Sequence, residues 1–217
     1  MTHNPGKADW ADDERVQRMA KSYNVRYDDE FWKAFETLTN DESRSAVADF
    51  GCGPGLWLAD AATRFNSTRL HGLDESEEML HQAEEIISKT IPTENIQLDL
   101  INLDKERIAI KEDSLDLAFS GYVLHELANP NDFSSQVYSI LKRNGTYVVF
   151  DFVATNIDLF VKVMAQAGMS EDRAKSRYPH MCKHSITDIE AVLKSAGFEN
   201  ISSELLDVRA IVVGLKP

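Results

Sequence analysis

The chain has 217 residues, 43% of them hydrophobic and 27% charged, which excludes disorder over most of the length and fits one globular domain. A formal net charge of −13 disfavours duplex nucleic acid and anionic membranes as partners, because an acidic surface repels phosphate groups. The two cysteines lie far apart and no apolar run approaches the roughly 20 residues that span a bilayer, so we expect a cytoplasmic protein.

The first 40 residues have a helical pattern. Apolar residues recur at helical spacing in 16–23 and again in 31–38. We therefore predict an N-terminal helical extension over residues 1–40, followed by the main domain over residues 41–217.

Short runs rich in β-branched residues alternate with helical runs in the main domain. We predict strands at 46–50, 70–73, 96–101, 115–120 and 146–152, and helices at 56–65, 77–90, 132–141 and 186–196. The alternation is typical of a parallel sheet with crossover helices. Two closing strands, 201–206 and 209–215, indicate an antiparallel hairpin.

The predicted fold is therefore α/β: a Rossmann-like, doubly wound, seven-stranded sheet, mostly parallel, with a C-terminal antiparallel hairpin and N-terminal helices. Extra helical sequence at about 154–184 interrupts the alternation. We expect that insert to carry substrate-specific structure.

A glycine-rich loop follows the first predicted strand and reads Asp49-Phe50-Gly51-Cys52-Gly53-Pro54-Gly55. Glycines at this place let a ligand approach the main chain closely. The loop lacks the G-x-G-x-x-G spacing of dinucleotide sites and the Gly-Lys-Ser/Thr of a P-loop. A tight strand-to-helix turn without function is the alternative.

An acidic residue, Asp74, ends the second predicted strand. A carboxylate there can accept both hydroxyls of a ribose. The alternative is that Asp74 belongs only to the start of the next helix, with Ser76 as its N-cap.

Together, the glycine loop with its preceding acid, Asp74 and the closing hairpin resemble the class I S-adenosylmethionine-dependent methyltransferases. Residues 119–127 and 141–146 resemble the small-molecule branch that includes ubiquinone-type C-methyltransferases. The resemblance runs from about Tyr27 to the C-terminus. It implies S-adenosylmethionine as the cofactor.

The resemblance also implies roles for individual residues. Asp49 would contact the methionine amino group, the main chain of the loop would hold the methionine portion, and Asp74 would bind the ribose. The full set of implied cofactor-binding residues is Asp49, Gly51, Cys52, Gly53, Asp74, Glu75, Met79, Leu103, Asp104 and Ser120. The loop after the third strand lacks the small residue usual after its acid.

Methyl transfer from a sulfonium mainly requires alignment of the nucleophile with the methyl group, so a catalytic residue is not obligatory. His125, after the fourth strand, is the candidate general base, and a structural histidine at a helix start is the alternative. Tyr23 and Tyr27 are expected in a lid over the cofactor, and Tyr122 beside the substrate.

Three residues with side chains that can bind metal alternate near the end of the insert: His180, Cys182 and His184. Structural zinc usually takes four ligands, and no second pair lies nearby, so we predict no metal site. We expect His180 and His184 to line the acceptor pocket instead. The basic residues around them, such as Arg173 and Arg177, are expected to form a solvated helix flank.

The sequence thus predicts methyl transfer by in-line displacement to a small-molecule acceptor at oxygen, nitrogen, carbon or sulfur. It leaves the acceptor and the oligomeric state open. The alternatives are a nicotinamide-dependent Rossmann oxidoreductase and a non-catalytic S-adenosylmethionine-binding module.

Overall fold

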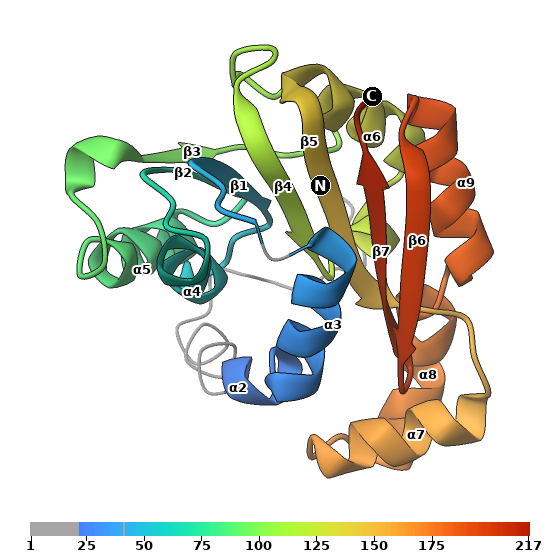
Figure 1. Ribbon diagram of the computed structural model, residues 1–217. Helices are drawn as coiled ribbons and strands as arrows, with labels where there is room; N and C mark the ends of the chain where they lie inside the picture. The colour runs from blue at the N-terminus through green and yellow to red at the C-terminus, as the bar shows by residue number, and fades with distance from the viewer. Residues whose placement is uncertain (1–21, 41) are drawn as a thin grey trace.

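A seven-stranded sheet organises the chain in the computed structural model, which describes residues 22–40 and 42–217 (Figure 1). The strand order is β3-β2-β1-β4-β5-β7-β6. The strands are β1 (Ala46–Phe50), β2 (Arg69–Asp74), β3 (Ile96–Leu100), β4 (Leu115–Gly121), β5 (Leu141–Phe152), β6 (Glu199–Leu206) and β7 (Arg209–Leu215). Neighbouring strands run parallel except β7, which is antiparallel to both β5 and β6. The predicted fold class is confirmed.

The centre of the sheet is also the point where the strand order reverses. β1 pairs with β2 on one side and with β4 on the other, and all five residues of β1 are buried. Burial on both faces explains why β1 reads as an uninterrupted small and apolar run apart from Asp49. Ligands gather beyond the carboxyl ends of the strands at such a reversal, where the glycine loop lies.

Helices cover both faces of the sheet. They are α2 (Tyr23–Arg26), α3 (Asp29–Thr39), α4 (Leu56–Arg64), α5 (Glu77–Ile87), α6 (Pro130–Ile140), α7 (Ile157–Gln166), α8 (Glu171–Met181) and α9 (Ile186–Ala196), with 3₁₀ turns η1 (Thr93–Asn95) and η2 (Leu124–Glu126). The apolar sides of α6 and α9 pack in one core, and those of α3, α4 and α5 in the other. The pair α7–α8 forms a separate small core around Phe160, at the lower end of the molecule in Figure 1.

Local signals fix the ends of several helices. Ser76 accepts a hydrogen bond from the Met79 N–H and begins α5. Ser185 and Asp188 form a capping box at the start of α9, and Gly197, with φ of 104°, ends it. The sequence predicted these boundaries because they depend on neighbouring residues alone.

Aromatic side chains fill the core between α3, α4 and the sheet. Phe35 is completely buried, and the rings of Trp57 and Phe119 stack with their centroids 3.9 Å apart. On α3, the ring centroid of Phe35 lies 6.0 Å from that of Phe119 and the ring centroid of Phe31 lies 4.7 Å from that of Phe150, so α3 packs against β4 and β5.

Two details differ from the sequence-based expectation. β5 begins at Leu141 rather than at residue 146: Leu141 pairs with Leu115 and Thr146 with Leu117, and the residues between them form an irregularity of the strand in which Asn144 adopts a φ of 62°. Residues 178–181 are the last turn of α8 and not an extended segment, so alternation does not bring His180, Cys182 and His184 to one side. The predicted helical residues 16–21 lie outside the described part of the chain.

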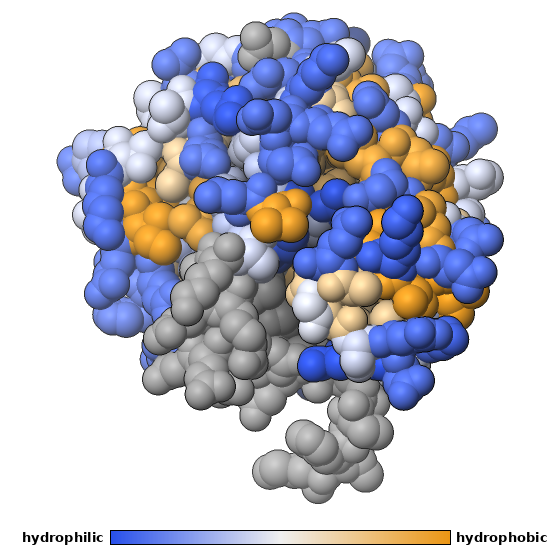
Figure 2. All heavy atoms as spheres, turned by 90° about the horizontal axis from the view of Figure 1, so that it is seen from below, coloured by the Kyte–Doolittle hydropathy of each residue, from blue (hydrophilic) through white to orange (hydrophobic). Residues whose placement is uncertain are grey.

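The outer surface is mixed in character. Figure 2 shows orange apolar patches separated by blue hydrophilic side chains on the face seen from below. Exposed large apolar residues include Val25, Leu100, Ile157, Leu159 and Leu205. In the described ranges, no helix combines the length and the apolar character that crossing a membrane requires.

The packing of α4 against the sheet predicts the effect of truncating Leu58, which is completely buried. Leu58→Ala should lower the free energy of unfolding by about 2–5 kcal/mol, because it leaves a cavity in a packed core. Leu205→Ala is the matched control, since Leu205 is 54% exposed, and its effect should stay under about 1 kcal/mol. Equal losses in urea denaturation of the two variants would contradict this arrangement.

Candidate functional site

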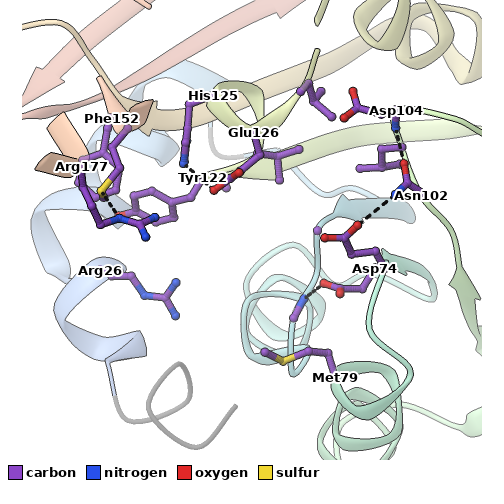
Figure 3. Close-up of a pocket in the computed structure, with 18 of the residues that line it drawn as sticks. Arg26, Asp74, Met79, Asn102, Asp104, Tyr122, His125, Glu126, Phe152 and Arg177 are labelled. Carbon is purple, nitrogen blue, oxygen red and sulfur yellow. Dashed lines mark hydrogen bonds and ion pairs between the residues drawn. The ribbon is translucent and has the colours of Figure 1, made fainter. Parts of the chain in front are cut away.

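A cavity of about 330 Å³ opens at the carboxyl ends of the central strands (Figure 3). It extends from the glycine loop and the end of β2, past the end of β4, to η2 and α8. Its lining includes Gly51, Gly53, Asp74, Glu75, Met79, residues 101–104 and 121–123, His125, Glu126, Phe152 and Arg177. A smaller cavity of about 40 Å³ shares Arg26, Gly51, Gly53 and Gly121 with it and reaches Asp49, Cys52, Tyr23 and Tyr27.

The glycine loop is tied to the end of β2 by its main chain. The N–H groups of Gly51 and Cys52 donate to the Leu73 carbonyl oxygen at 2.7 and 3.0 Å. Gly51 has a φ of 74°, and a Cβ added there would lie 2.6 Å from Val123 Cγ2. The residue must therefore be glycine for two reasons, backbone conformation and close packing.

The carboxylate of Asp74 is held by main-chain donors on both sides. Its Oδ2 accepts from the Gly53 N–H at 2.8 Å, and its Oδ1 accepts from the Ser76 N–H at 2.9 Å. Burial raises the pKa of Asp74 to about 6, although these hydrogen bonds oppose the shift. Each oxygen keeps acceptor capacity toward the cavity, which fits the two hydroxyls of a ribose.

Asp49, the residue before the last of strand β1, is 3% exposed. Burial, with a contribution from the charge of Asp74, raises the pKa of Asp49 well above its usual range. A cation bound in the small cavity would stabilise the ionised form of this carboxyl. The ammonium group of a methionine moiety meets that requirement.

The far side of the cavity is built by residues after β3. Leu103 and Asp104 line it, as do Ile101 and Asn102. Asn102 donates to Glu75 Oε2 at 3.1 Å, and Asp104 Oδ1 accepts from the Ala128 N–H at 2.8 Å. Asp104 thus positions the segment after η2 as well as lining the cavity. Met79 lies on the adjoining first turn of α5 and is 2% exposed.

Two predicted cofactor residues offer little chemistry through their side chains. Ser120 is completely buried and exchanges a hydrogen bond with Tyr147 at 2.9 Å, so its side chain faces the interior while Gly121 and Tyr122 line the cavity. Burial raises the pKa of the Cys52 thiol well above its usual range, which keeps it protonated.

His125 is joined to a buried carboxylate of β5. The ring Nδ1 of His125 lies 2.6 Å from Asp151 Oδ1, and the main-chain N–H of His125 donates to Asp151 Oδ2 at 3.1 Å. Its Nε2 lies 3.4 Å from Glu126 Oε1. Burial lowers the pKa of His125, but Asp151 and Glu126 outweigh that effect and raise it to about 9.

Glu126 connects His125 with the helical insert. Its Oε2 lies 3.0 Å from His180 Nε2 on α8. Burial opposes the shift, but the hydrogen bonds and charges of His125 and His180 lower the pKa of Glu126 to about 2. His180, 54 positions away in the sequence, thereby reaches the site through a folded helix.

The predicted lid tyrosines are packed side chains in the described structure. Tyr23 donates to Asp60 Oδ2 at 2.7 Å, and the half-buried ring of Tyr27 packs against those of Phe31, Phe119 and Phe150. Both tyrosines border the small cavity. Tyr122 lines the main cavity and has a φ of 61°, a conformation that non-glycine residues adopt at a cost of about 1–3 kcal/mol.

The structure places several residues of the insert differently from the sequence-based expectation. His184 is not among the residues that line the main cavity, and its Nε2 is buried without a hydrogen-bond partner among the residues that the structure describes. Arg173 and Arg177 line the cavity, whereas Lys175 forms an exposed pair with Glu171. The solvated-flank interpretation is therefore correct for Lys175 and wrong for Arg177.

Sequence reasoning also missed Arg26, Asp151 and Phe152. A single acid inside the most apolar strand was the available signal for Asp151.

Known proteins share this arrangement. Residues 47–145, which include the glycine loop and Asp74, match the family model of a methyltransferase domain. The chain is 28% identical over 137 residues to a malonyl-(acyl-carrier protein) O-methyltransferase of Halalkalibacterium halodurans, which covers 61% of this chain and 49% of that protein. It is 27% identical over 127 residues to an uncharacterised chloroplastic methyltransferase of Arabidopsis thaliana, covering 58% of this chain and 36% of that protein.

Solved structures agree with the fold. An S-adenosylmethionine-dependent methyltransferase from Aquifex aeolicus superposes with a TM-score of 0.71 at 16% identity, over 97% of this chain and 100% of that one. Phosphoethanolamine N-methyltransferase 2 of Haemonchus contortus, in complex with S-adenosylmethionine, superposes with a TM-score of 0.70 at 14% identity. The match covers 98% of this chain and 61% of that one. Residues 47–145 are thus similar to a methyltransferase domain, and the fold is that of solved S-adenosylmethionine-dependent methyltransferases. The chain spans about half or less of the two curated relatives named above.

The packing at Gly51 predicts that Gly51→Ala weakens S-adenosylhomocysteine binding by about 1–3 kcal/mol, because the added methyl group displaces Val123 or the loop. Gly168→Ala is the control. It has the same left-handed strain, with φ of 82°, but open space around its Cβ. Isothermal titration should show a loss of affinity in the first variant only. Equal affinity of the two variants would argue against a close approach of the ligand to this loop.

Proposed function

We propose that the chain transfers a methyl group from S-adenosylmethionine to a small-molecule acceptor by in-line displacement. The observation that carries this proposal is the continuity of the main cavity. It reaches from the carboxylate of Asp74, which the Gly53 N–H holds by a hydrogen bond, past Gly121. It ends at His125 of η2 and at Arg173 and Arg177 of α8. Donor and acceptor can therefore meet in one continuous cavity.

The cofactor end divides into recognisable parts. Asp74 is placed to accept the ribose hydroxyls, and Leu103 with Met79 forms an apolar surface for adenine. Asp49 is placed to pair with the methionine ammonium group. Arg26 borders both cavities, with its guanidinium 5.6 and 5.7 Å from the ring centroids of Tyr27 and Tyr122, and can face the methionine carboxylate.

The chemistry required of the chain is alignment. When bound, S-adenosylmethionine supplies an electrophilic methyl group on a sulfonium. The rigid ends of β1 and β4 hold the two sides of the cavity in fixed register, so the acceptor meets the methyl group in one orientation. Such positioning accounts for roughly 7–11 kcal/mol of a barrier in favourable cases.

The acceptor end is formed by Phe152 and by side chains of the insert, including Met181 and Arg177. The helices α7 and α8 support our proposal that residues 154–184 carry substrate specificity. Two arginines at this end, in a chain with a net charge of −13, favour an acceptor with an anionic group. A matched relative acts on malonyl-(acyl-carrier protein), which also carries a carboxylate.

The role of His125 as a general base stays a prediction. Both of its ring nitrogens face carboxylates in the described structure, and without a bound metal ion its raised pKa of about 9 keeps the imidazole protonated at neutral pH. A protonated imidazole accepts no proton. We therefore propose that methyl transfer depends on alignment, and that His125 orders this end of the cavity.

We further propose that residues 1–40 act as a lid. The contact of Tyr27 supports this: Tyr27 borders the small cavity, and its hydroxyl oxygen lies 2.3 Å from where a Cβ on Gly121, at the end of β4, would be. Closure of such a segment would exclude water from the reacting groups.

Removal of the Asp74 carboxylate tests the cofactor end. Asp74→Ala should weaken S-adenosylmethionine binding by about 1.5–3 kcal/mol, because hydrogen bonds to a charged group are lost. Asp99→Ala is the control, since this aspartate on β3 bonds to the exposed Gln97. Isothermal titration with wild-type protein should show one site, and absence of binding at millimolar cofactor would refute the proposal.

The same carboxylate predicts a pH dependence. Affinity for S-adenosylhomocysteine should be constant well above pH 6 and fall as the pH drops through the Asp74 pKa of about 6, because protonated Asp74 loses acceptor capacity. The decrease should be absent in Asp74→Asn. A wild-type affinity that rises on acidification would contradict the assignment of Asp74.

Two other functions remain distinguishable by experiment. A nicotinamide-dependent oxidoreductase would change the fluorescence of NADH on mixing, and we expect no change. A non-catalytic binding module would bind S-adenosylmethionine without turnover in a broad screen of acceptors that includes carboxylates.

A further inference from the structure

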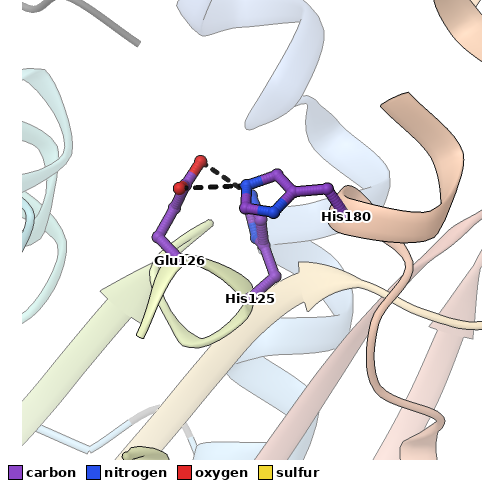
Figure 4. Close-up of side chains that lie close together, drawn as sticks. All are labelled: His125, Glu126 and His180. Carbon is purple, nitrogen blue, oxygen red and sulfur yellow. Dashed lines mark hydrogen bonds and ion pairs between the residues drawn. The ribbon is translucent and has the colours of Figure 1, made fainter. Parts of the chain in front are cut away.

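Three side chains with metal-binding atoms converge at the acceptor end of the main cavity (Figure 4). His125 and Glu126 come from η2, and His180 comes from α8. His125 Nε2 lies 3.4 Å from Glu126 Oε1, and His180 Nε2 lies 3.0 Å from Glu126 Oε2. The three ligand atoms all lie within 4.8 Å of one another.

A buried carboxylate stands behind this group. Asp151 is 1% exposed and holds His125 by both the ring Nδ1 and the main-chain N–H. The contact leaves Nε2 directed at Glu126. Metal-binding histidines typically donate their other ring N–H to a carboxylate in this way, which fixes the tautomer and the orientation of the ring.

We propose that His125, Glu126 and His180 bind one divalent transition-metal ion. Ligands about 2.0–2.2 Å from a metal lie roughly 3–3.5 Å apart, which the two contacts with Glu126 already match. The side chain of His180 is 40% exposed, so it has room to adjust. Two imidazoles and one carboxylate are a donor set that suits iron, cobalt, zinc or manganese.

The position of the site gives the metal a function. Three protein ligands leave coordination positions open, and His125 and Glu126 line the cavity. An oxygen atom of the acceptor can occupy an open position and be held facing the methyl group. This use of the site rests on the proposed methyl transfer, whereas metal binding itself does not.

The contrasting arrangement is an ion-pair network that only joins α8 to η2. In that case the two histidines would compete for the charge of one carboxylate, and added metal would find no preference for these residues. The two arrangements differ in one measurable property, the affinity for a metal ion.

The experiment uses the untagged full chain, stripped with a chelator and dialysed. Isothermal titration with Zn²⁺, and visible absorption with Co²⁺, should show one ion per chain. Glu126→Gln and His180→Ala should each weaken Zn²⁺ binding by at least about tenfold. His81→Ala is the matched control, because His81 forms an exposed pair with Glu85 at 3.7 Å outside the cluster. The Zn²⁺ affinity of this variant should equal that of the wild type.

Two outcomes would overturn the metal site. One is wild-type protein without stoichiometric binding, and the other is binding that neither Glu126→Gln nor His180→Ala weakens. Circular dichroism on the same samples confirms that the variants are folded. S-adenosylhomocysteine titration of the same preparations separates the two proposals, since its failure with Zn²⁺ binding intact would contradict methyl transfer and leave the metal site standing.

Discussion

The hydrogen bond from the Gly53 N–H to Asp74 Oδ2 joins the two halves of the cofactor site. It connects the loop after β1 with the end of β2, and the Leu73 carbonyl oxygen adds two further main-chain contacts to the same loop. Because these contacts involve main-chain donors and acceptors, they fix the loop independently of most side chains. The cavity, the orientation of Asp74 and the opening toward β4 all depend on this junction.

Buried acids are the second constraint on the site. Asp49, Asp74 and Asp151 are the last or second-to-last residues of β1, β2 and β5, near the carboxyl ends of these strands. A carboxylate in that environment requires donors or a cation, since desolvation disfavours its charged form. The structure provides main-chain N–H groups for Asp74 and an imidazole for Asp151. The proposed donors for Asp49 arrive with the ligand.

The sequence predicted those parts of the molecule that depend on local patterns. Strand periodicity, the Ser76 cap and the Gly197 helix end are readable from a few neighbouring residues, and the loop and Asp74 follow from the fold that those patterns predict. The link between Glu126 and His180 was not predictable in this way, because it depends on how α8 packs against η2. Arg177 was interpreted as a solvated residue because helical spacing alone cannot say which side of α8 meets the cavity. Ser120 shows the same limit at a strand end, where one position decides whether a side chain faces the cavity or the interior.

A crystal structure of the chain with S-adenosylhomocysteine tests the central claim most directly. The account predicts ribose hydroxyls on the Asp74 carboxylate, adenine against Leu103 and Met79, and the sulfur atom beside Gly121, directed toward η2. A ligand bound elsewhere, or one whose ribose contacts residues other than Asp74, would contradict the account.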